Sequence, residues 1–308
     1  MPSLLARFAS NIFWMARFLE RAESLARILD ITQTYARDKS TESDPLRVLD
    51  IYADTERFAE QNGEGASVLD FYITDRRNPT SIAFAIAAAR QNARSVRHLI
   101  STEMWTQLNI FHTYIVGLKH NDIRSENRSR VCAQIKLNCQ TIEGIAEGTL
   151  LRGEAWRFYQ LGKYIERADQ TTRMLDIGYH QLAGGEDEAI ISVQWNMLLR
   201  AVAGYHAYRS RHPAGSYARD VAAFLLYDEE FARAVALCIN RITEGLEDIE
   251  RRHGGKQQPA LETARRVVEF TLSTGPGGIT QERLHDFIDD LQSGLGQISN
   301  EIGKAYFY

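Results

Sequence analysis

The sequence has little of what stabilises small secreted proteins or anchors a chain in a membrane. Only three of its 308 residues are cysteine, and none forms a Cys-x-x-Cys pair. Reduced thiols in a cytoplasmic protein are therefore expected, and a disulfide framework is not. No run of about eighteen uncharged apolar residues occurs, which excludes a membrane-spanning helix. Charged residues interrupt the apolar N-terminus, which lacks a cleavable small-residue site, so no signal peptide is predicted.

The sequence also lacks a large excess of either charge. It has 36 lysines and arginines against 40 acidic residues, and the formal net charge is −4. This balance does not favour nucleic acid as the main partner. Because the arginines do not form runs, any anion binding is expected at a local site.

Proline is scarce, with six residues in the whole chain. Apolar residues recur at steps of three and four, without strict alternation, which predicts an all-α protein. The expected architecture is a bundle of roughly ten helices in a single domain over residues 1–308. The helices that matter below are predicted at 4–35, 46–61, 79–118, 154–182 and 187–209, and the third is expected to begin at Asn78-Pro79.

One segment of the sequence occurs twice. Phe-Leu-Glu-Arg-Ala-Glu at 18–23 matches Tyr-Ile-Glu-Arg-Ala-Asp at 164–169, and the match continues from 27–31 to 173–177. The offset is constant at 146 positions, far longer than the period of a solenoid. The repeat predicts two similar halves, led by the helices at 4–35 and 154–182.

Each repeat helix has a charged stripe on an otherwise apolar surface. A rotation of ~100° per residue places the following residues in these stripes: Arg17, Glu20, Ser24 and Arg27 in the first, with Arg21 beside it; Lys163, Glu166, Gln170 and Arg173 in the second, with Arg167 beside it. A helix that is apolar nearly all round is usually buried, so these charges need partners. They are either structural networks that set helix register or the walls of a shared polar cavity.

A third stripe lies on the helix predicted at 79–118. Arg90, Arg94, Arg97 and Ser101 fall within roughly 60° of each other, and no acid on that helix faces them. Either a solvated surface or partners from elsewhere would explain three such arginines. We predict that they converge with both repeat stripes on one internal site that holds an anionic ligand. The converging residues would be Glu20, Arg27, Arg90, Arg94, Arg97, Glu166 and Arg173.

Two Glu-x-x-His pairs, Glu250…His253 and Glu282…His285, raise the alternative of a di-iron site, to which Glu20 and Glu166 would add two carboxylates. Both pairs come late in the chain and are not interleaved with the two glutamate helices. No metal and no cofactor are therefore predicted.

These motifs resemble the bacterial alpha-E family, a helical domain of unknown function with a Glu-Arg motif. The resemblance rests on Phe-Trp-Met-Ala-Arg-Phe-Leu-Glu-Arg-Ala at 13–22, Arg-Gln-Asn-Ala-Arg-Ser-Val-Arg at 90–97, Glu-Met-Trp-Thr-Gln-Leu-Asn at 103–109, Glu-Arg-Ala at 166–168 and Ala-Tyr-Phe at 305–307. The family motifs fall on Glu20, Arg21, Glu166 and Arg167, and on Arg90, Asn92, Arg94 and Arg97.

The resemblance implies a partner. Alpha-E proteins are encoded beside, or fused to, circularly permuted ATP-grasp proteins, often with transglutaminase-like peptidases. The first hypothesis is a partner of an ATP-grasp ligase in peptide or amide-bond formation, in which Glu20 and Glu166 are the catalytic candidates. The arginines and Asn92 would bind an activated, anionic small molecule or peptide. The alternatives are a non-catalytic helical scaffold and, after that, a di-iron oxidase.

Overall fold

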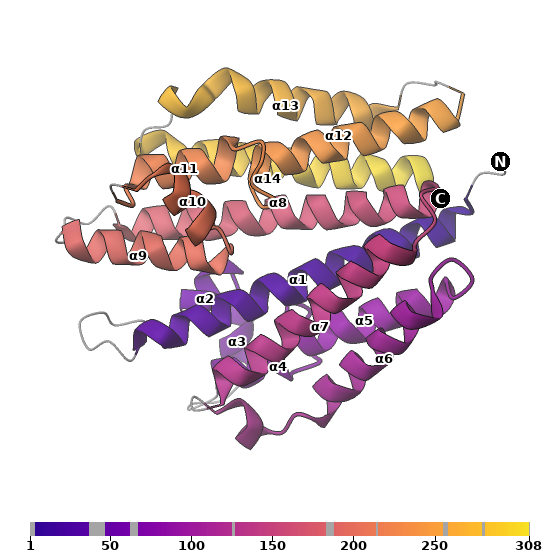
Figure 1. Cartoon of the computed structure of the whole chain (residues 1–308), viewed down its shortest axis with the longest axis horizontal. Helices are drawn as coiled ribbons and strands as arrows, with labels where there is room; N and C mark the ends of the chain where they lie inside the picture. Colours follow the sequence, from indigo (N-terminus) through magenta and orange to yellow (C-terminus); the bar gives the residue numbers. More distant parts are fainter. Residues whose placement is uncertain are drawn as a thin grey trace. The chain divides into compact units, whose positions relative to one another are not determined.

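The computed structural model describes residues 4–36, 47–61, 67–124, 127–182, 188–213, 215–254, 258–278 and 281–307. These parts of the chain form helices and connecting turns without a strand, which confirms the all-α prediction (Figure 1). The elements are α1 (Ala6–Ala36), α2 (Arg47–Ile51), α3 (Thr55–Gln61), α4 (Val68–Ile73), α5 (Ile82–Ser95), α6 (Thr102–Gly117), the 3-10 helix η1 (His120–Ile123), α7 (Arg128–Thr149), α8 (Glu154–Leu182), α9 (Glu188–Ala201), α10 (Tyr205–Arg211), α11 (Ala218–Tyr227), α12 (Val235–Arg252), α13 (Pro259–Gly278) and α14 (Gln281–Tyr306).

The chain divides into two compact units. Unit 1 comprises Met1–Phe13 and Gly153–Tyr308, and unit 2 comprises Trp14–Arg152. The first turns of α1 therefore belong to unit 1 and the rest of that helix to unit 2, so the two copies of the repeat lie mainly in different units. The single domain expected over 1–308 stays a prediction.

Four long helices build unit 1. Helix α12 packs against α8 and α13, and α14 closes the arrangement by packing against α13 and α8 (Figure 1). The shorter α9 and α11 also pack against α8. Apolar side chains such as Leu161, Ile242 and Leu295 are almost completely buried. Because every long helix contributes an apolar stripe, burial of this surface is the main stabilising term.

Unit 2 is built around α5, α6 and α7, which pack in chain order, with α4 against α5. Serine hydroxyls cap two of these helices. Ser81 accepts a hydrogen bond from the Phe84 amide, and Ser101 accepts one from the Met104 amide. Such caps satisfy backbone donors that have no partner within the helix.

The prediction of one helix over 79–118 is wrong. Helix α5 ends at Ser95, its C-cap Val96 leaves the helical conformation (φ −119°, ψ 27°), and α6 starts only after the extended Ser101. The start of the predicted helix is also displaced, because α5 begins only at Ile82. Asn78 is buried instead, and its side-chain amide nitrogen donates a hydrogen bond to the Phe71 carbonyl. Arg97 therefore lies in a turn, and the helical rotation that aligned it with Arg90 does not apply.

Two further predicted helices are each divided in two. Ala53 (φ 50°) separates α2 from α3, and Ala203 (φ 57°) separates α9 from α10. In both cases the residue after the left-handed alanine donates its backbone N–H to a carbonyl of the preceding helix. Asp54 donates to Leu49, and Gly204 donates to Leu199. This is a common helix ending, but it usually uses glycine, so alanine gave no signal.

The cysteines and the apolar character of the helices can be examined in the described structure. Cys132, Cys139 and Cys238 are free and buried, and burial raises the pKa of the Cys132 thiol to about 12. Among the described helices, none combines the length and the apolar character needed to cross a bilayer.

Candidate functional site

The predicted site residues are distributed over both units. Unit 1 holds Glu166, Arg167 and Arg173, and unit 2 holds the remaining residues: Arg17, Glu20, Arg21, Arg27, Arg90, Asn92, Arg94 and Arg97. Their convergence on one site stays a prediction, as do the catalytic roles of Glu20 and Glu166. Within each unit the local geometry is defined.

The two Glu-Arg pairs have the same local structure. Glu20 and Glu166 are buried, 5% and 0% exposed. The following arginine lies against the aromatic residue one turn earlier in each copy: the guanidinium carbon of Arg21 is 5.7 Å from the ring centroid of Phe18, and that of Arg167 is 5.7 Å from Tyr164. Both motif arginines therefore have a cation–π contact.

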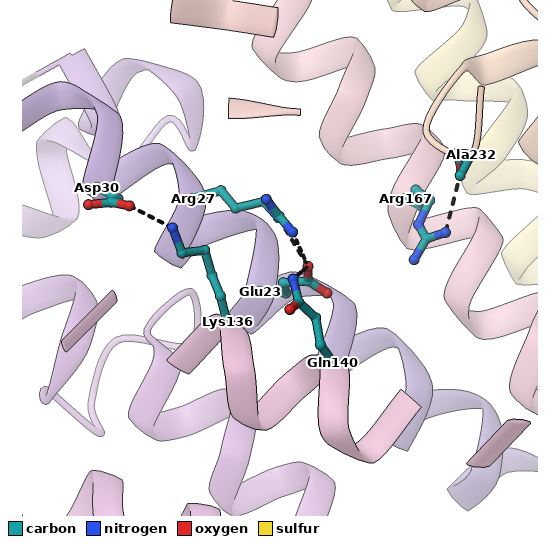
Figure 2. Close-up of polar contacts among 7 residues, drawn as sticks. All are labelled: Glu23, Arg27, Asp30, Lys136, Gln140, Arg167 and Ala232. Carbon is teal, nitrogen blue, oxygen red and sulfur yellow. Dashed lines mark hydrogen bonds and ion pairs between the residues drawn. The ribbon is translucent and has the colours of Figure 1, made fainter. Parts of the chain in front are cut away.

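In the first copy, Glu23 joins α1 to α7 (Figure 2). Its Oε1 accepts from Arg27 Nε at 3.0 Å and Nη2 at 2.6 Å, and from Gln140 Nε2 of α7 at 3.3 Å. Two turns further along α1, Asp30 Oδ2 lies 2.6 Å from Lys136 Nζ of α7. The contacts of Gln140 and Lys136 with α1 connect residues more than a hundred positions apart, which indicates a structural role.

The second copy repeats this pairing within unit 1. Arg173 Nε lies 2.8 Å from Asp169 Oδ2, with the same four-residue spacing. Arg167 Nη1 donates to the Ala232 carbonyl at 3.4 Å (Figure 2), and the Thr171 hydroxyl donates to the Arg233 carbonyl at 2.9 Å. The second motif thus holds the segment between α11 and α12.

Sequence reasoning missed the acids of these pairs. Glu23 and Asp169 stand four residues before Arg27 and Arg173, a spacing known to favour a helical ion pair. That signal was present in both copies. Glu166 accepts a hydrogen bond from Gln170 Nε2 at 3.1 Å, also with a spacing of four.

The middle motif forms a cluster of two arginines, Arg90 and Arg97, with Trp105 and Asn109, here called the Trp105 cluster. The guanidinium carbons of Arg90 and Arg97 lie 5.5 Å and 5.3 Å from the Trp105 ring centroid. Asn109 Oδ1 accepts from Arg90 Nε at 2.7 Å, and its amide nitrogen donates to the Trp105 carbonyl at 2.7 Å. A turn and two helices thus bring both cations to one indole.

This part of unit 2 carries unneutralised positive charge. Within the described ranges, Arg90, Arg94 and Arg97 make no ion pair with a carboxylate. Arg94 is exposed, while Arg90, Asn92 and Arg97 are half-buried. Burial lowers the pKa of His112, and the charges of Arg90 and Arg76 lower it further. Burial is the larger cause, and the two arginines show that the positive charge of this region extends to His112.

The two Glu-x-x-His pairs do not share a site. His253 Nε2 lies 2.9 Å from Glu154 at the start of α8, and His285 Nδ1 lies 2.9 Å from Asp176, twenty-two residues further along the same helix. At 1.5 Å per residue, these carboxylates are roughly 33 Å apart along α8. The di-iron alternative needs both pairs around one centre, and this geometry does not provide it.

One group in unit 1 could hold a metal ion. The ligand atoms of Asp176, His285 and Asp289 lie within 4.8 Å of one another. His285 already contacts both acids, with Nε2 3.6 Å from Asp289 Oδ2. The hydrogen bond with Asp176, together with the charges of Asp176, Asp289 and Asp286, raises its pKa. A doubly paired imidazolium explains these contacts without a metal.

The raised pKa of His285 gives a pH prediction. In the folded protein His285 should titrate above 6.5, and Asp176→Asn should bring its pKa back toward that value. Its contribution to stability is complete below about pH 6.5 and is lost as the pH rises through the higher folded-state pKa. The contribution stays below ~1 kcal/mol because the imidazole is exposed. A histidine NMR titration measures the pKa, and a value at or below 6.5 would contradict the pairing.

Comparison with known proteins gives the family. The Alpha-E model, described as a predicted alpha-helical domain with a conserved ER motif, matches residues 4–307. Similar curated proteins include an uncharacterized protein of Mycobacterium bovis and one of Mycobacterium tuberculosis strain CDC 1551. Each is 23% identical over 266 residues, which cover 79% of this chain. The match spans 30% of the length of each relative. No solved structure matches the chain. Since the family model covers nearly all of the sequence, the chain belongs to the Alpha-E family, and it carries Glu-Arg pairs at 20–21 and 166–167.

Proposed function

We propose that the protein binds an anionic small molecule at the Trp105 cluster, as the partner of an ATP-grasp ligase in amide-bond formation. The observation that supports the binding function is the pair of guanidinium groups at one indole without a carboxylate partner. Guanidinium groups recognise carboxylates and phosphates through paired hydrogen bonds. The connection to an ATP-grasp ligase rests on the resemblance to the Alpha-E family.

The orientation of Arg90 supports this proposal. Its Nε is already bonded to Asn109, so the two terminal nitrogens are the donors left for a ligand. Arg97 approaches the same ring from the turn after α5. A planar or tetrahedral anion that contacts both guanidinium groups would gain two sets of donors. Arg94, exposed nearby in sequence, adds positive charge that attracts anions to this face.

A phosphate titration tests the binding function. We expect saturable binding of inorganic phosphate, weakened at least about tenfold in Arg90→Gln and lost in the double variant with Arg97→Gln, because charge-assisted hydrogen bonds are removed. Arg77→Gln is the matched control. It removes an exposed arginine of the same unit that is paired with Asp75, and it changes the net charge equally. Isothermal titration calorimetry measures the affinity. Equal weakening in the control would mean nonspecific attraction and would contradict the site.

A reconstitution tests the partnership. Mixed with a circularly permuted ATP-grasp protein from the same organism, the chain should form a complex and change the yield of ligase product. The Arg90→Gln/Arg97→Gln variant should still bind the ligase but lose its effect on the product. If no complex forms and the yield of product does not change, the partnership is contradicted. The result of the phosphate titration would still stand in that case.

A helical scaffold is the second candidate function. It is favoured by the ion pairs of the repeat, each of which forms within a single helix: Glu23 with Arg27, and Asp169 with Arg173. Arginines that are already bonded in this way are less available to a ligand. If the protein is a scaffold, removing these ion pairs should lower the free energy of unfolding and leave the phosphate affinity unchanged.

A further inference from the structure

Unit 1 contains a cavity of about 380 Å³. It lies where α8 begins and where α12 and α14 end, and Figure 1 shows these helix ends. Its apolar walls come from the start of α1, from Phe158 and from Ala305. Its polar walls are Glu154, His253, Gln258 and Tyr306. A volume of this size suits a small organic molecule. None of these polar residues belongs to the Trp105 cluster, which lies in unit 2.

The polar groups around the cavity are ordered by hydrogen bonds. Glu154 Oε2 accepts from the Leu4 amide at 2.6 Å, and its Oε1 lies 2.9 Å from His253 Nε2. Glu250, 8% exposed, accepts from the Gln258 amide at 2.7 Å. Two carboxylates are therefore fixed at this end of the unit, one of which lines the cavity itself.

Tyr306 is the exception in this arrangement. Its hydroxyl is buried and has no hydrogen-bond partner among the described residues. The ring is held by Phe158, with 5.5 Å between centroids, and by His253, with 5.9 Å. Burial and the charges of Glu250 and Glu154 raise the pKa of Tyr306 to about 12, so the phenol is neutral. A buried hydroxyl without a partner is rare and indicates a missing partner.

The charge around the cavity selects the kind of ligand. Among the described residues here, Glu154 and Glu250 contribute two negative charges, and His253 contributes at most one positive charge. The nearby cations are engaged elsewhere, since Arg157 and Arg252 both bond Asp248. The C-terminal ends of α12 and α14 add partial negative charge, and the N-terminal ends of α1, α8 and α13 add partial positive charge, so the helix dipoles offset one another and the ionised side chains set the sign. The balance is negative in either protonation state of His253.

We propose that this cavity binds a small primary ammonium ion. Glu154 neutralises its charge, the Tyr306 hydroxyl oxygen accepts one of its hydrogen bonds, and the short apolar group of the ligand packs against Phe158 and the first turn of α1. Such an ion supplies the donor that the phenol oxygen lacks. The proposal does not depend on anion binding at the Trp105 cluster.

The test compares three ligands of the same shape: isobutylammonium, isobutyl alcohol and isobutyrate. The NMR signals of the His253 ring report occupancy of the cavity. We expect saturable shifts with isobutylammonium and none with the alcohol or the carboxylate. Tyr306→Phe should weaken binding of the ammonium ion about tenfold, since it removes one hydrogen bond to a charged group. The change leaves the fold intact because the hydroxyl bonds nothing in the protein.

The matched control is Tyr227→Phe. Tyr227 is another residue of unit 1 whose buried hydroxyl has no partner, and burial likewise raises its pKa to about 12, but it does not line the cavity. Unchanged affinity in this variant supports the proposal. Equal binding of the alcohol, binding of the carboxylate, absence of ammonium binding, or full affinity in Tyr306→Phe would each overturn it.

Discussion

Replacing Gly162 with alanine should cost at least about 3 kcal/mol of stability, because an extra group is forced into a fully packed contact. A Cβ at this position of α8 would lie 2.2 Å from the carbonyl oxygen of Phe13 on α1 and 3.0 Å from its carbonyl carbon. Both obstacles are backbone atoms, so no side-chain rotation relieves the clash. Helices α1 and α8 would have to separate, which would also disturb the contact of Phe13 with Phe307, whose ring centroids are 5.3 Å apart.

Two further glycines of unit 1 are controls for this result. Gly296 lies exposed in the middle of α14, and no described atom lies within 4 Å of the position that a Cβ would take there. Gly296→Ala should therefore raise the free energy of unfolding by about 0.5–1 kcal/mol, because alanine has the higher helix propensity. A Cβ added at Gly294 would lie 2.7 Å from Val267 Cγ2, a side-chain atom that can move. The effect of Gly294→Ala on stability should therefore fall between those of the other two substitutions. Urea unfolding at constant m measures all three changes. A Gly162→Ala variant as stable as the wild type would refute the close approach of the two backbones.

The sequence was sufficient for the fold class and for the elements with a strong periodic signal. The helix at 154–182 has the predicted bounds because a long apolar stripe ends at clear breaks on both sides. The repeat was equally informative. It predicted that residues 146 positions apart would be equivalent, and the guanidinium carbons of Arg21 and Arg167 both lie 5.7 Å from the ring of the aromatic residue one turn earlier.

The sequence was not sufficient where one or two residues leave the helical conformation. Ala53 and Ala203 adopt positive φ although alanine has no preference for it, so tertiary packing must determine these breaks. Ser101 was assigned to a stripe within a helix, but it is the N-cap of α6. Serine within a run of helix-forming residues is compatible with both positions, and periodicity alone does not separate them.

The candidate site shows the same limit. Counting charges suggested that the arginines must meet Glu20 and Glu166, but the described contacts include aromatic rings as partners of Arg21, Arg90, Arg97 and Arg167. An aromatic face attracts a guanidinium group without neutralising its charge. A cation held in this way is positioned by the protein and still available to an anion, which a count of acids against arginines does not reveal.

The repeat also provides an internal comparison of two equivalent ion pairs. Glu23→Gln should lower the free energy of unfolding by about 2 kcal/mol, whereas Asp169→Asn should lower it by less than about 1 kcal/mol. The Glu23 and Arg27 side chains are 8% and 14% exposed, so water screens their attraction weakly. Asp169 and Arg173 are 17% and 35% exposed. Both substitutions keep an oxygen acceptor, so each mainly removes the charge.

The larger loss at Glu23 has a second cause, since its Oε1 also accepts from Gln140 and thereby connects α1 to α7. Urea unfolding of both variants, with the phosphate affinity measured in parallel, distinguishes the two candidate functions. If the ion pairs are structural, Glu23→Gln loses stability while the remaining folded protein binds phosphate as tightly as the wild type. If Glu23→Gln leaves stability unchanged but alters phosphate affinity, Arg27 serves the ligand, and the structural role of the pair is refuted. Equal losses of stability in the two variants would show that burial does not set the strength of these pairs.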